Sequence, residues 1–272
     1  MILNDENRWA LPDLASAIAW SFKRQSEGIA VALDALGEYA KTSEQAFQAA
    51  NDYLHTLQAI KNSGLSKAGI AIKPSALGLK LNRDLAENYM RQIARLGQKL
   101  EVPVEVDMEG TPTVNDICEI AQKLSGEGFS LVLALQAYLD RTATDLASCI
   151  KAGLKIRLVK GAYMGDTSDF SKIQQRLINL FKQAMSFDKS LDVGTHDPYV
   201  VEQLKTHLDE NTKALVTFGF LKGLADQSKL KMVKEGFQVS EYVPFGNNRS
   251  AYIKRREAYL KNLSALQLLP LP

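Results

Sequence analysis

The sequence predicts an α/β protein of the (β/α)8 TIM-barrel class, with a helical arm before the barrel and a functional helix at its end. Two observations predict it: short β-branched runs alternate with helical periods along the chain, and eight such runs fall within 272 residues. This alternation implies parallel pairing through right-handed crossovers, and about 250 residues is a usual length for a closed barrel. No strand-like run is followed by Gly-x-Gly-x-x-Gly, which argues against a dinucleotide-binding sheet.

The chain divides into three predicted parts: a helical arm over residues 1–28, the barrel over 29–263 and a tail over 264–272. In the arm, Leu11 and Trp20 belong to an amphipathic helical pattern that is suited to covering the barrel, to self-association or to a membrane surface. The eight predicted strands are Ile29–Asp34, Gly69–Lys73, Val102–Met108, Ser130–Gln136, Lys155–Lys160, Leu191–His196, Lys213–Phe218 and Phe237–Val243.

Capping residues and apolar spacing predict the helices between the strands. Ser43 is expected to cap a helix that has Phe47 on its apolar face, and Gly64 is expected to end it. Thr113 and Asp116 have the spacing of a capping box in front of another apolar run.

Composition excludes several classes of function. The net charge is only +2, from 33 basic and 31 acidic residues, and no run of like charge is long enough to follow a nucleic-acid backbone. Cys118 and Cys149 lie in apolar helix-like segments and are expected to be reduced core thiols. The start lacks a signal-peptide pattern, and no stretch of about 18 apolar residues occurs. We expect a cytoplasmic protein with at most peripheral contact at the inner membrane face.

Polar and mostly cationic side chains stand at the ends of the predicted strands. Active groups of such barrels lie at the carboxyl ends of the strands and in the loops that follow. Charged side chains are poor choices for an apolar strand interior, because burying an unpaired charge is unfavourable. Any one of them is more often a solvated strand end, but together they suit a ring around an anionic ligand. They are Lys73, Asp107 with Glu109, Gln136 with Tyr138, Arg157 with Lys160, His196 and Tyr242.

The final predicted helix carries Tyr252, Arg255 and Arg256 at spacings of three and four residues, which place them on one face. Two guanidinium groups side by side can hold a small carboxylate, because each donates hydrogen bonds in a plane that matches the two acid oxygens. Taken alone, a Lys-Arg-Arg-Glu run is more often a solvated helix face. The cationic strand ends favour the carboxylate-binding interpretation.

Seven motifs contain these residues in a fixed order along the chain. They are Lys-Pro-Ser-Ala-Leu-Gly at 73–78, Val-Asp-Met-Glu at 106–109, Gln-Ala-Tyr-Leu at 136–139, Arg-Leu-Val-Lys-Gly-Ala-Tyr at 157–163, Thr-His at 195–196, Tyr-Val-Pro-Phe-Gly at 242–246 and Tyr252-x-x-Arg255-Arg256. With Leu-Asp-Ala-Leu-Gly-Glu at 33–38, they resemble the proline dehydrogenase family over about residues 29–262.

The resemblance implies a flavin-dependent barrel that oxidises L-proline to 1-pyrroline-5-carboxylate, the first step of proline catabolism. It implies FAD as the cofactor, with FMN as the alternative, a quinone as the electron acceptor, and a pyrroline-5-carboxylate dehydrogenase as a partner. Two other functions remain open. One is a dehydrogenase for a related cyclic imino acid such as hydroxyproline, and the other is a barrel that binds flavin or an amino acid without turnover.

The resemblance also implies a role for each site residue. Arg157 is expected near flavin N5, where a positive charge favours reduction, and Asp107 is expected to order the site beside Lys73. The implied catalytic set is Arg157, Lys73, Asp107 and Tyr252, and no metal is implied. The implied substrate-binding set is Arg255, Arg256, Lys73, Tyr242, Tyr252, Tyr163 and Leu158. The implied cofactor-binding set is Arg157, Gln136, Lys160, Gly161, Tyr163, His196 and Thr195.

Five positions depart from the family pattern. Met164 replaces a common Trp, and Tyr259 replaces a glutamate, so that an ion pair which normally closes the site lacks its acid. Thr217 and Gly219 replace Glu and Gln in the seventh strand, which can loosen the hold on the cofactor. Asp197 replaces a common Asn, and its charge is unfavourable near a phosphate unless it serves only to cap the helix that the next proline begins.

Overall fold

The computed structural model describes residues 6–161, 165–247 and 249–265. Outside the described residues lie Tyr163, Met164, Asn248 and most of the predicted tail, together with the side chains of Tyr259 and of residues 262–265.

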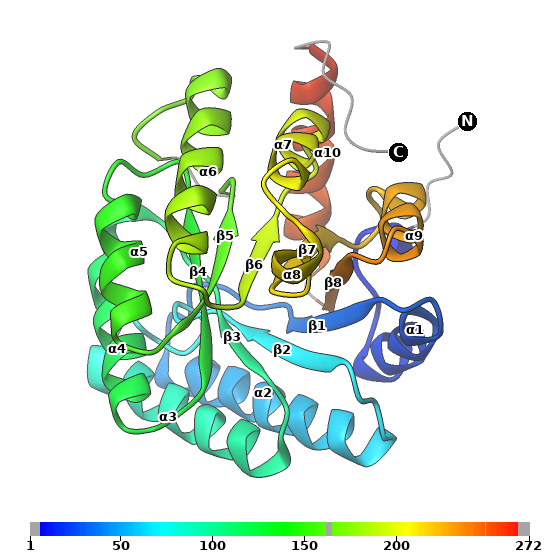
Figure 1. The fold of residues 1–272 in the computed structure, drawn as a ribbon. Coiled ribbons are helices and arrows are strands. Elements are labelled where there is room, and N and C mark those ends of the chain that lie inside the picture. Colours follow the sequence, from blue (N-terminus) through cyan, green and yellow to red (C-terminus); the bar gives the residue numbers. More distant parts are fainter. Residues whose placement is uncertain (1–5, 162–164, 248, 266–272) are drawn as a thin grey trace.

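Eight parallel strands close into a barrel in chain order, and β8 pairs with β1 (Figure 1). The predicted (β/α)8 barrel is confirmed. The strands are β1 (Ala30–Ala35), β2 (Ala68–Ile72), β3 (Val104–Val106), β4 (Leu131–Gln136), β5 (Lys155–Val159), β6 (Leu191–Gly194), β7 (Val216–Leu221) and β8 (Gln238–Phe245).

Helices surround the barrel, with α2 to α6 forming a continuous outer layer (Figure 1). Among the described residues, no helix is both long enough and apolar enough to cross a membrane. The helices are η1 (Glu6–Arg8), α1 (Leu14–Ser26), α2 (Ser43–Ser63), α3 (Arg83–Leu100), η2 (Thr111–Thr113), α4 (Val114–Gly126), α5 (Thr142–Lys151), α6 (Phe170–Met185), α7 (Pro198–Lys205), α8 (Glu210–Lys213), α9 (Asp226–Lys234) and α10 (Arg249–Ala265).

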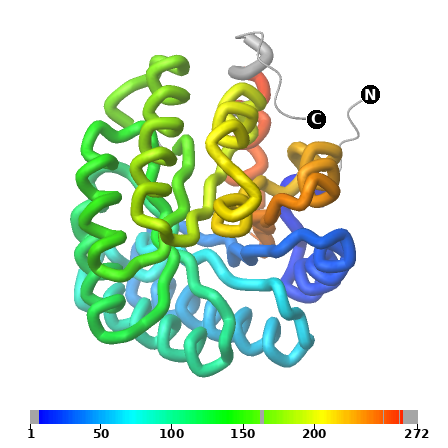
Figure 2. The backbone as a smooth tube through the Cα atoms, viewed as in Figure 1, coloured from blue at the N-terminus to red at the C-terminus, as the bar shows by residue number. Residues whose placement is uncertain are grey.

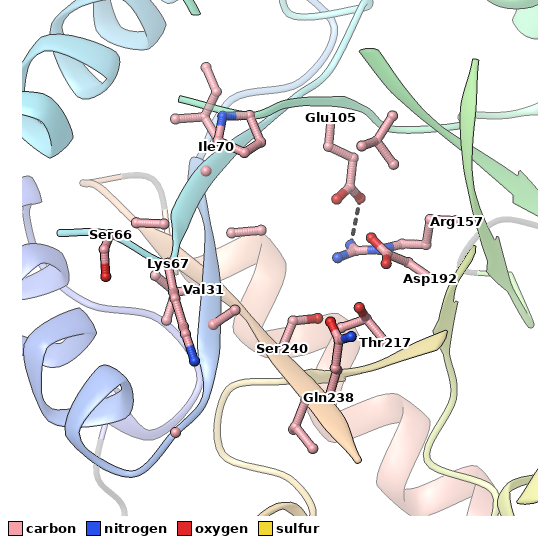
Figure 3. A pocket seen from close by; sticks show the side chains of 18 of the residues that line it. Val31, Ser66, Lys67, Ile70, Glu105, Arg157, Asp192, Thr217, Gln238 and Ser240 are labelled. Atoms are coloured by element: carbon pink, nitrogen blue, oxygen red, sulfur yellow. Dashed lines mark ion pairs between the residues drawn. The ribbon is translucent and has the colours of Figure 1, made fainter. Parts of the chain in front are cut away.

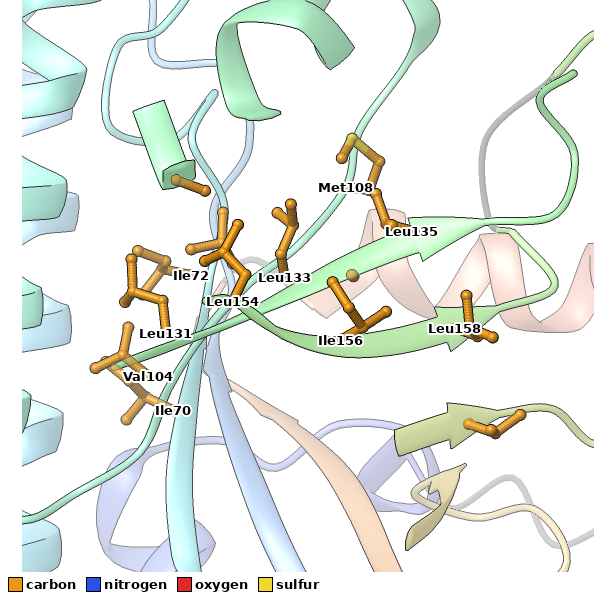
Figure 4. Packing of buried hydrophobic residues seen from close by; sticks show 14 of the residues in the cluster. Ile70, Ile72, Val104, Met108, Leu131, Leu133, Leu135, Leu154, Ile156 and Leu158 are labelled. Atoms are coloured by element: carbon orange, nitrogen blue, oxygen red, sulfur yellow. The ribbon is translucent and has the colours of Figure 1, made fainter. Parts of the chain in front are cut away.

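The large aliphatic side chains of the strands face the helix layer rather than the barrel interior. Leu131, Leu133 and Leu135 recur at every second position of β4 and belong to the same buried cluster as Ile156 and Leu158 of β5 (Figure 4). Because side chains alternate along a strand, the residues between them point inward. The inward positions therefore include small and charged side chains, such as Ala134 and Arg157, beside Val132.

Two predicted helix starts were wrong. Thr42, not Ser43, caps α2, because its Oγ1 accepts the Gln45 N–H at 3.3 Å. Gly64 ends this helix in the left-handed conformation, as predicted, with φ of 77°. Phe47 is 56% exposed, because the buried face of α2 runs through Ala46 and repeats at helical spacing from there.

The capping box expected at Thr113 does not form. Thr113 lies at the end of η2 with φ of −107° and ψ of −5°, outside the extended conformation of a capping residue. Its hydroxyl instead donates to the Gly110 carbonyl oxygen at 2.9 Å. The helix α4 therefore starts from a preceding 3-10 turn. The two cysteines, Cys118 and Cys149, are buried free thiols as expected.

Most strands differ from their predicted bounds by one or two residues, and the differences in β3, β6 and β7 have the largest consequences. β3 has only three residues, and β6 ends at Gly194, before His196. β7 begins at Val216 rather than Lys213, because Asp209 caps the short helix α8 by accepting the N–H groups of Asn211 and Thr212. The capped helix α8 thus includes the residue at which the strand was expected to begin.

The segment before the barrel closes the seam between β8 and β1. Helix α1 packs on both strands, so a helix near the beginning of the sequence lies beside the last strand (Figure 2). Leu11, predicted to be helical, instead forms a parallel bridge with Phe245. Its N–H donates to the Pro244 oxygen at 2.9 Å, and its carbonyl accepts from Gly246 at 3.0 Å. The boundaries of the three predicted parts stay predictions.

A buried group of ionic side chains joins α1 to β8 and α9. Glu241 of β8 is fully buried and accepts hydrogen bonds from Trp20 Nε1, at 2.7 Å, and from Lys229 Nζ. Arg24 Nη2 lies 3.0 Å from Glu241 and 2.5 Å from Asp226. Ion pairs this far from water are costly to break singly, because the remaining charge has no solvent to compensate it.

Replacement of this buried ammonium by an apolar side chain, Lys229→Met, should lower the free energy of unfolding by about 3 kcal/mol, because the Glu241 carboxylate then loses a buried partner. The measurement is urea denaturation followed by circular dichroism. The matched control is Lys61→Met, which removes a partly exposed lysine paired with Glu101 and should cost less than about 1 kcal/mol. Equal losses in the two variants would contradict the role of the buried group.

Candidate active site

Lys73, directly after β2, is the centre of a buried polar cluster. Its Nζ lies 2.7 Å from Asp34 Oδ1, 2.9 Å from Tyr242 Oη and 3.1 Å from Asp107 Oδ2. The Tyr242 hydroxyl in turn donates to Asp107 at 2.7 Å. An ammonium has three N–H groups, and here three oxygen atoms surround it. Oxygen atoms of the protein therefore already bind the Lys73 ammonium. Lys73 has little hydrogen-bonding capacity left for the substrate carboxylate that it was expected to help bind.

Burial and charge fix the protonation state of this cluster. Burial alone lowers the pKa of Lys73, but Asp34, with Tyr242 and Asp107, outweighs it and holds that pKa well above its ordinary value. Burial, followed by the charges of Asp107 and Asp34, raises the pKa of the Tyr242 hydroxyl far above its ordinary value. Lys73 is thus a cation and Tyr242 a neutral hydroxyl. Behind them, Tyr53 Oη accepts the Lys73 backbone N–H at 3.1 Å.

Arg157 projects from β5 into the middle of the barrel. Its Nη1 lies 2.5 Å from Glu105 Oε1 of β3, and its Cζ lies 6.0 Å from the centre of the Tyr242 ring. Burial lowers the pKa of Arg157, but Glu105 and then Asp192 raise it by more. Burial raises the pKa of Glu105 to about 8, although Arg157 opposes this. Arg157 therefore lies beside the Lys73 cluster and carries a fixed charge there.

A cavity of about 450 Å³ opens from Arg157 towards the amino ends of the strands (Figure 3). Arg157 Nε and Ser240 Oγ are buried beside it and have no hydrogen-bond partner among the described residues. A Cβ added to Gly219 would lie 3.3 Å from Ser240 Oγ and 3.8 Å from Arg157 Nη2. The small residue at this departure from the family pattern therefore leaves space next to Arg157. The other polar residues lining the cavity are Ser66, Lys67, Glu105, Asp192, Thr217 and Gln238.

Gln136 and Glu109 link the strand ends on the opposite side. Gln136 is 2% exposed, and its Nε2 donates to the Glu109 backbone oxygen at 2.9 Å. The Glu109 carboxylate accepts the Ser75 backbone N–H at 2.7 Å and the Ser75 hydroxyl. Glu109 therefore ties the loop after β2 to that after β3. Nearby, the Tyr138 ring fills the space of a side chain at Gly161, which has φ of 127°, so only glycine fits there.

Lys160 directly follows β5 and lies beside an aromatic ring and a carboxylate. Its Nζ lies 3.3 Å from the centre of the Phe170 ring and 3.9 Å from Asp197 Oδ2. Burial lowers the pKa of Lys160 to about 8, and Asp197 only partly opposes it. Asp197 caps α7 through the N–H groups of Tyr199 and Val200, but it does not serve only as a cap, because its Oδ2 also accepts from Gln174 Nε2 at 2.7 Å.

His196 is a buried, neutral imidazole. Its Nε2 accepts the Leu221 N–H at 2.9 Å, which places the ring proton on Nδ1. Burial lowers the pKa of His196 to about 3, with smaller contributions from Lys229, Arg256 and Lys160. Thr195 beside it is 3% exposed, and its Oγ1 accepts the Asp197 N–H at 3.2 Å.

Helix α10 presents two inward side chains with free polar atoms. Tyr252 is 6% exposed, and its hydroxyl has no hydrogen-bond partner among the described residues. The Arg256 Cζ lies 5.1 Å from the Tyr252 ring centre, and its Nε is also without a partner in the described part of the chain. Burial raises the pKa of Tyr252 to about 12, against the charge of Arg256. Leu36, which follows β1, and Leu221, which ends β7, pack against the small cluster that contains Tyr252, so α10 lies at the carboxyl ends of the strands, where Lys73 also lies.

Arg255, next to Arg256 in the sequence, is more exposed and forms an ion pair with Glu38. Both of its terminal nitrogens bind Glu38, at 3.0 and 2.7 Å, and its side chain is 44% exposed. Glu38 follows β1, so this ion pair connects the helix to the first strand's loop. The site thus has an ion pair at its edge although Tyr259 replaces the usual glutamate.

Sequence reasoning missed several residues and misplaced one. Leu158 is fully buried and faces the helix layer, because it is adjacent in β5 to the inward Arg157. Leu221 instead packs beside Tyr252. Asp34 and Glu38 lay in the quoted motif at 33–38, and an acidic residue at a strand end was the available signal. Among the described residues, no group of three or more His, Cys, Asp or Glu side chains could hold a metal ion.

Known proteins of similar sequence or fold point to one family. Proline dehydrogenase 2 of Bacillus subtilis (strain 168) is 27% identical over 252 residues, which are 90% of this chain and 83% of that protein. Proline dehydrogenase of Deinococcus radiodurans is 28% identical over 256 residues, covering 90% of this chain and 82% of that protein.

Solved structures show the same fold. Proline utilization A (PutA) from Bdellovibrio bacteriovorus, inactivated by N-propargylglycine, superposes with a TM-score of 0.84 at 19% sequence identity. The match covers 92% of this chain but 32% of that one, so this chain spans about a third of that protein. A sequence profile described as proline dehydrogenase matches residues 18–176, more than half of the 272 residues, and this chain therefore belongs to the proline dehydrogenase family.

Proposed function

We propose that this chain oxidises L-proline to 1-pyrroline-5-carboxylate, with a bound flavin as the hydride acceptor and a quinone as the final acceptor. The observation that carries this proposal is that one side of the site offers hydrogen-bond donors and the other side is acidic. Tyr252 and Arg256 of α10 have buried donors without a partner among the described residues, and they lie at the same end of the barrel as the acidic cluster of Asp34, Lys73 and Asp107. A zwitterionic cyclic amino acid has a carboxylate for the first surface and an ammonium for the second.

The donor groups also suit a flavin. Its ring carries acceptor atoms along one edge, and Gln136, Arg157 and Lys160 supply donors from neighbouring strands β4 and β5. Arg157 Nε is buried and has no partner in the described part of the chain, as expected of a group that a ligand completes. We propose that these three residues hold the ring of FAD and that Thr195 and the protonated Nδ1 of His196 lie along its phosphate-bearing chain.

A bound flavin supplies the hydride acceptor and then passes electrons on. The protein supplies position and charge. Arg256, assisted by Arg255, binds the substrate carboxylate, while Tyr242 and Tyr252 enclose its ring and exclude water. Arg157 holds a positive charge in a buried interior, where it stabilises negative charge that accumulates on reduction. We further propose that a separate pyrroline-5-carboxylate dehydrogenase consumes the product.

Mixing the purified protein anaerobically with L-proline should bleach its visible flavin absorption band, because hydride transfer reduces the cofactor. Cyclopentanecarboxylate is the matched control, since it has the ring and the carboxylate but no nitrogen and should leave the band unchanged. Faster bleaching by hydroxyproline would make that imino acid the substrate. A coloured protein that no cyclic imino acid bleaches would be a binding module.

Arg256→Lys should raise the KM for L-proline by about ten-fold or more, because loss of a charged hydrogen bond costs about 1.5–3 kcal/mol. Arg255→Lys should raise KM in the same direction but by less, since Arg255 also binds Glu38 in the absence of substrate. Arg141→Lys is the control, because Arg141 pairs with Asp145 of α5. A KM for Arg256→Lys equal to that of the control would remove this arginine from the carboxylate site.

A further inference from the structure

The cluster around Lys73 carries one negative charge more than it balances. Asp34 and Asp107 both lie within 3.1 Å of the single Lys73 ammonium. Two hydroxyls contact Lys73: Tyr242 from β8 at its ammonium and Tyr53 from α2 at its backbone N–H. This count leaves out Arg157 of β5, which lies 2.5 Å from Glu105, and Glu109 after β3, which is bound to Ser75. With both aspartates ionised, the cluster is one proton short of neutrality.

The two aspartates occupy different sides of the lysine. Asp34 is on the closed side with no exposed surface, and its Oδ2 has no hydrogen-bond partner among the described residues. Asp107 has 18% of its side chain exposed, so its carboxylate is the one that a substrate can reach. Burial raises the pKa of Asp34, and Asp107 adds to this while Lys73 opposes it.

The proposed reaction needs an acceptor for a proton, so the following inference rests on the proposed function. A free amino acid carries an ammonium at neutral pH. Hydride can leave the carbon beside the nitrogen only when the nitrogen has a free electron pair to form the double bond. One proton must first leave the ammonium, and water is excluded from an enclosed site.

We propose that the Asp34–Lys73–Asp107–Tyr242 cluster accepts this ammonium proton, and that Asp34 is the positioning residue that keeps it able to do so. The N–H bond of the substrate breaks, its electron pair stays on nitrogen, and an O–H bond forms on the Asp107 carboxylate. The cluster passes from one negative charge to neutral. Asp34 balances the Lys73 charge from behind, so that Asp107 is free to take the proton. The proton returns to water when the product leaves.

Asp34→Asn keeps the shape of the side chain and removes its charge. At pH 7 the anaerobic rate of flavin reduction by L-proline should fall about 100-fold, the usual contribution of a positioned base, with little change in KM. The cluster can accept the proton only when it is ionised. Activity is therefore present above the pKa of the cluster and is lost as the pH falls below it. In the variant this acid limb should move up by at least about one pH unit, because only amine already deprotonated in solution then reacts.

Asp226→Asn is the matched control, since Asp226 also pairs with a buried lysine, Lys229, but lies outside the site. Its pH profile should equal that of the wild type. A second readout avoids turnover: tetrahydrofuran-2-carboxylate has oxygen in place of the nitrogen and no proton to release. Its affinity, measured from the perturbed flavin spectrum, should be the same for wild type and Asp34→Asn.

Two results would overturn the inference: an Asp34→Asn profile that overlays the wild type, or equal losses in analogue binding and in the rate of reduction. Should Asp34→Asn fail to fold, Asp107→Asn decides, because it removes the acceptor itself and must shift the acid limb in the same direction. A wild-type protein that L-proline does not reduce would instead overturn the proposed function.

Discussion

The buried ammonium of Lys73 is the interaction on which the site depends. A lone ammonium in this interior would be strongly unfavourable, and the protein compensates it with oxygen atoms from three other strands or their ends. Asp34 comes from β1, Asp107 follows β3 and Tyr242 comes from β8. Because β8, β1, β2 and β3 are consecutive in the closed barrel, this one charge connects the ends of four of the eight strands.

The division between barrel interior and helix layer makes this rim possible. Aliphatic side chains such as Ile70, Leu133 and Ile156 face the helices and provide the apolar burial that stabilises the fold. The interior can then hold Arg157 and Glu105 beside glycine and alanine positions instead of layers of branched residues. Stability and chemistry thus use opposite faces of the same strands, and α1 closes the outer layer where β8 meets β1.

The sequence predicted the parts that depend on local pattern. Strand-like runs and polar strand ends were sufficient for the barrel and for placing Lys73, Asp107 and Tyr242 near its mouth. The pairing of Arg255 with Glu38 could not be predicted, because the two residues are 217 positions apart and meet only when β8 closes on β1. Leu158 was misplaced for a simple reason: neighbours in a strand face opposite sides, and the motif gives no direction unless one inward residue is known.

The two walls of the site differ in whether their hydrogen-bond donors already have partners within the protein. This difference determines which ligands the site selects. Around Lys73 every strong donor is matched by a protein oxygen, whereas Tyr252 Oη and Arg256 Nε stay without partners among the described residues. A buried donor without a partner is unfavourable, so the free site favours ligands that bring an acceptor to α10. The Lys73 side already holds excess negative charge and favours a cationic group. A neutral ligand would satisfy neither wall, and an anion without an ammonium would satisfy only one. The site therefore selects a small zwitterion, because the α10 side needs a hydrogen-bond acceptor and the Lys73 side favours a cation.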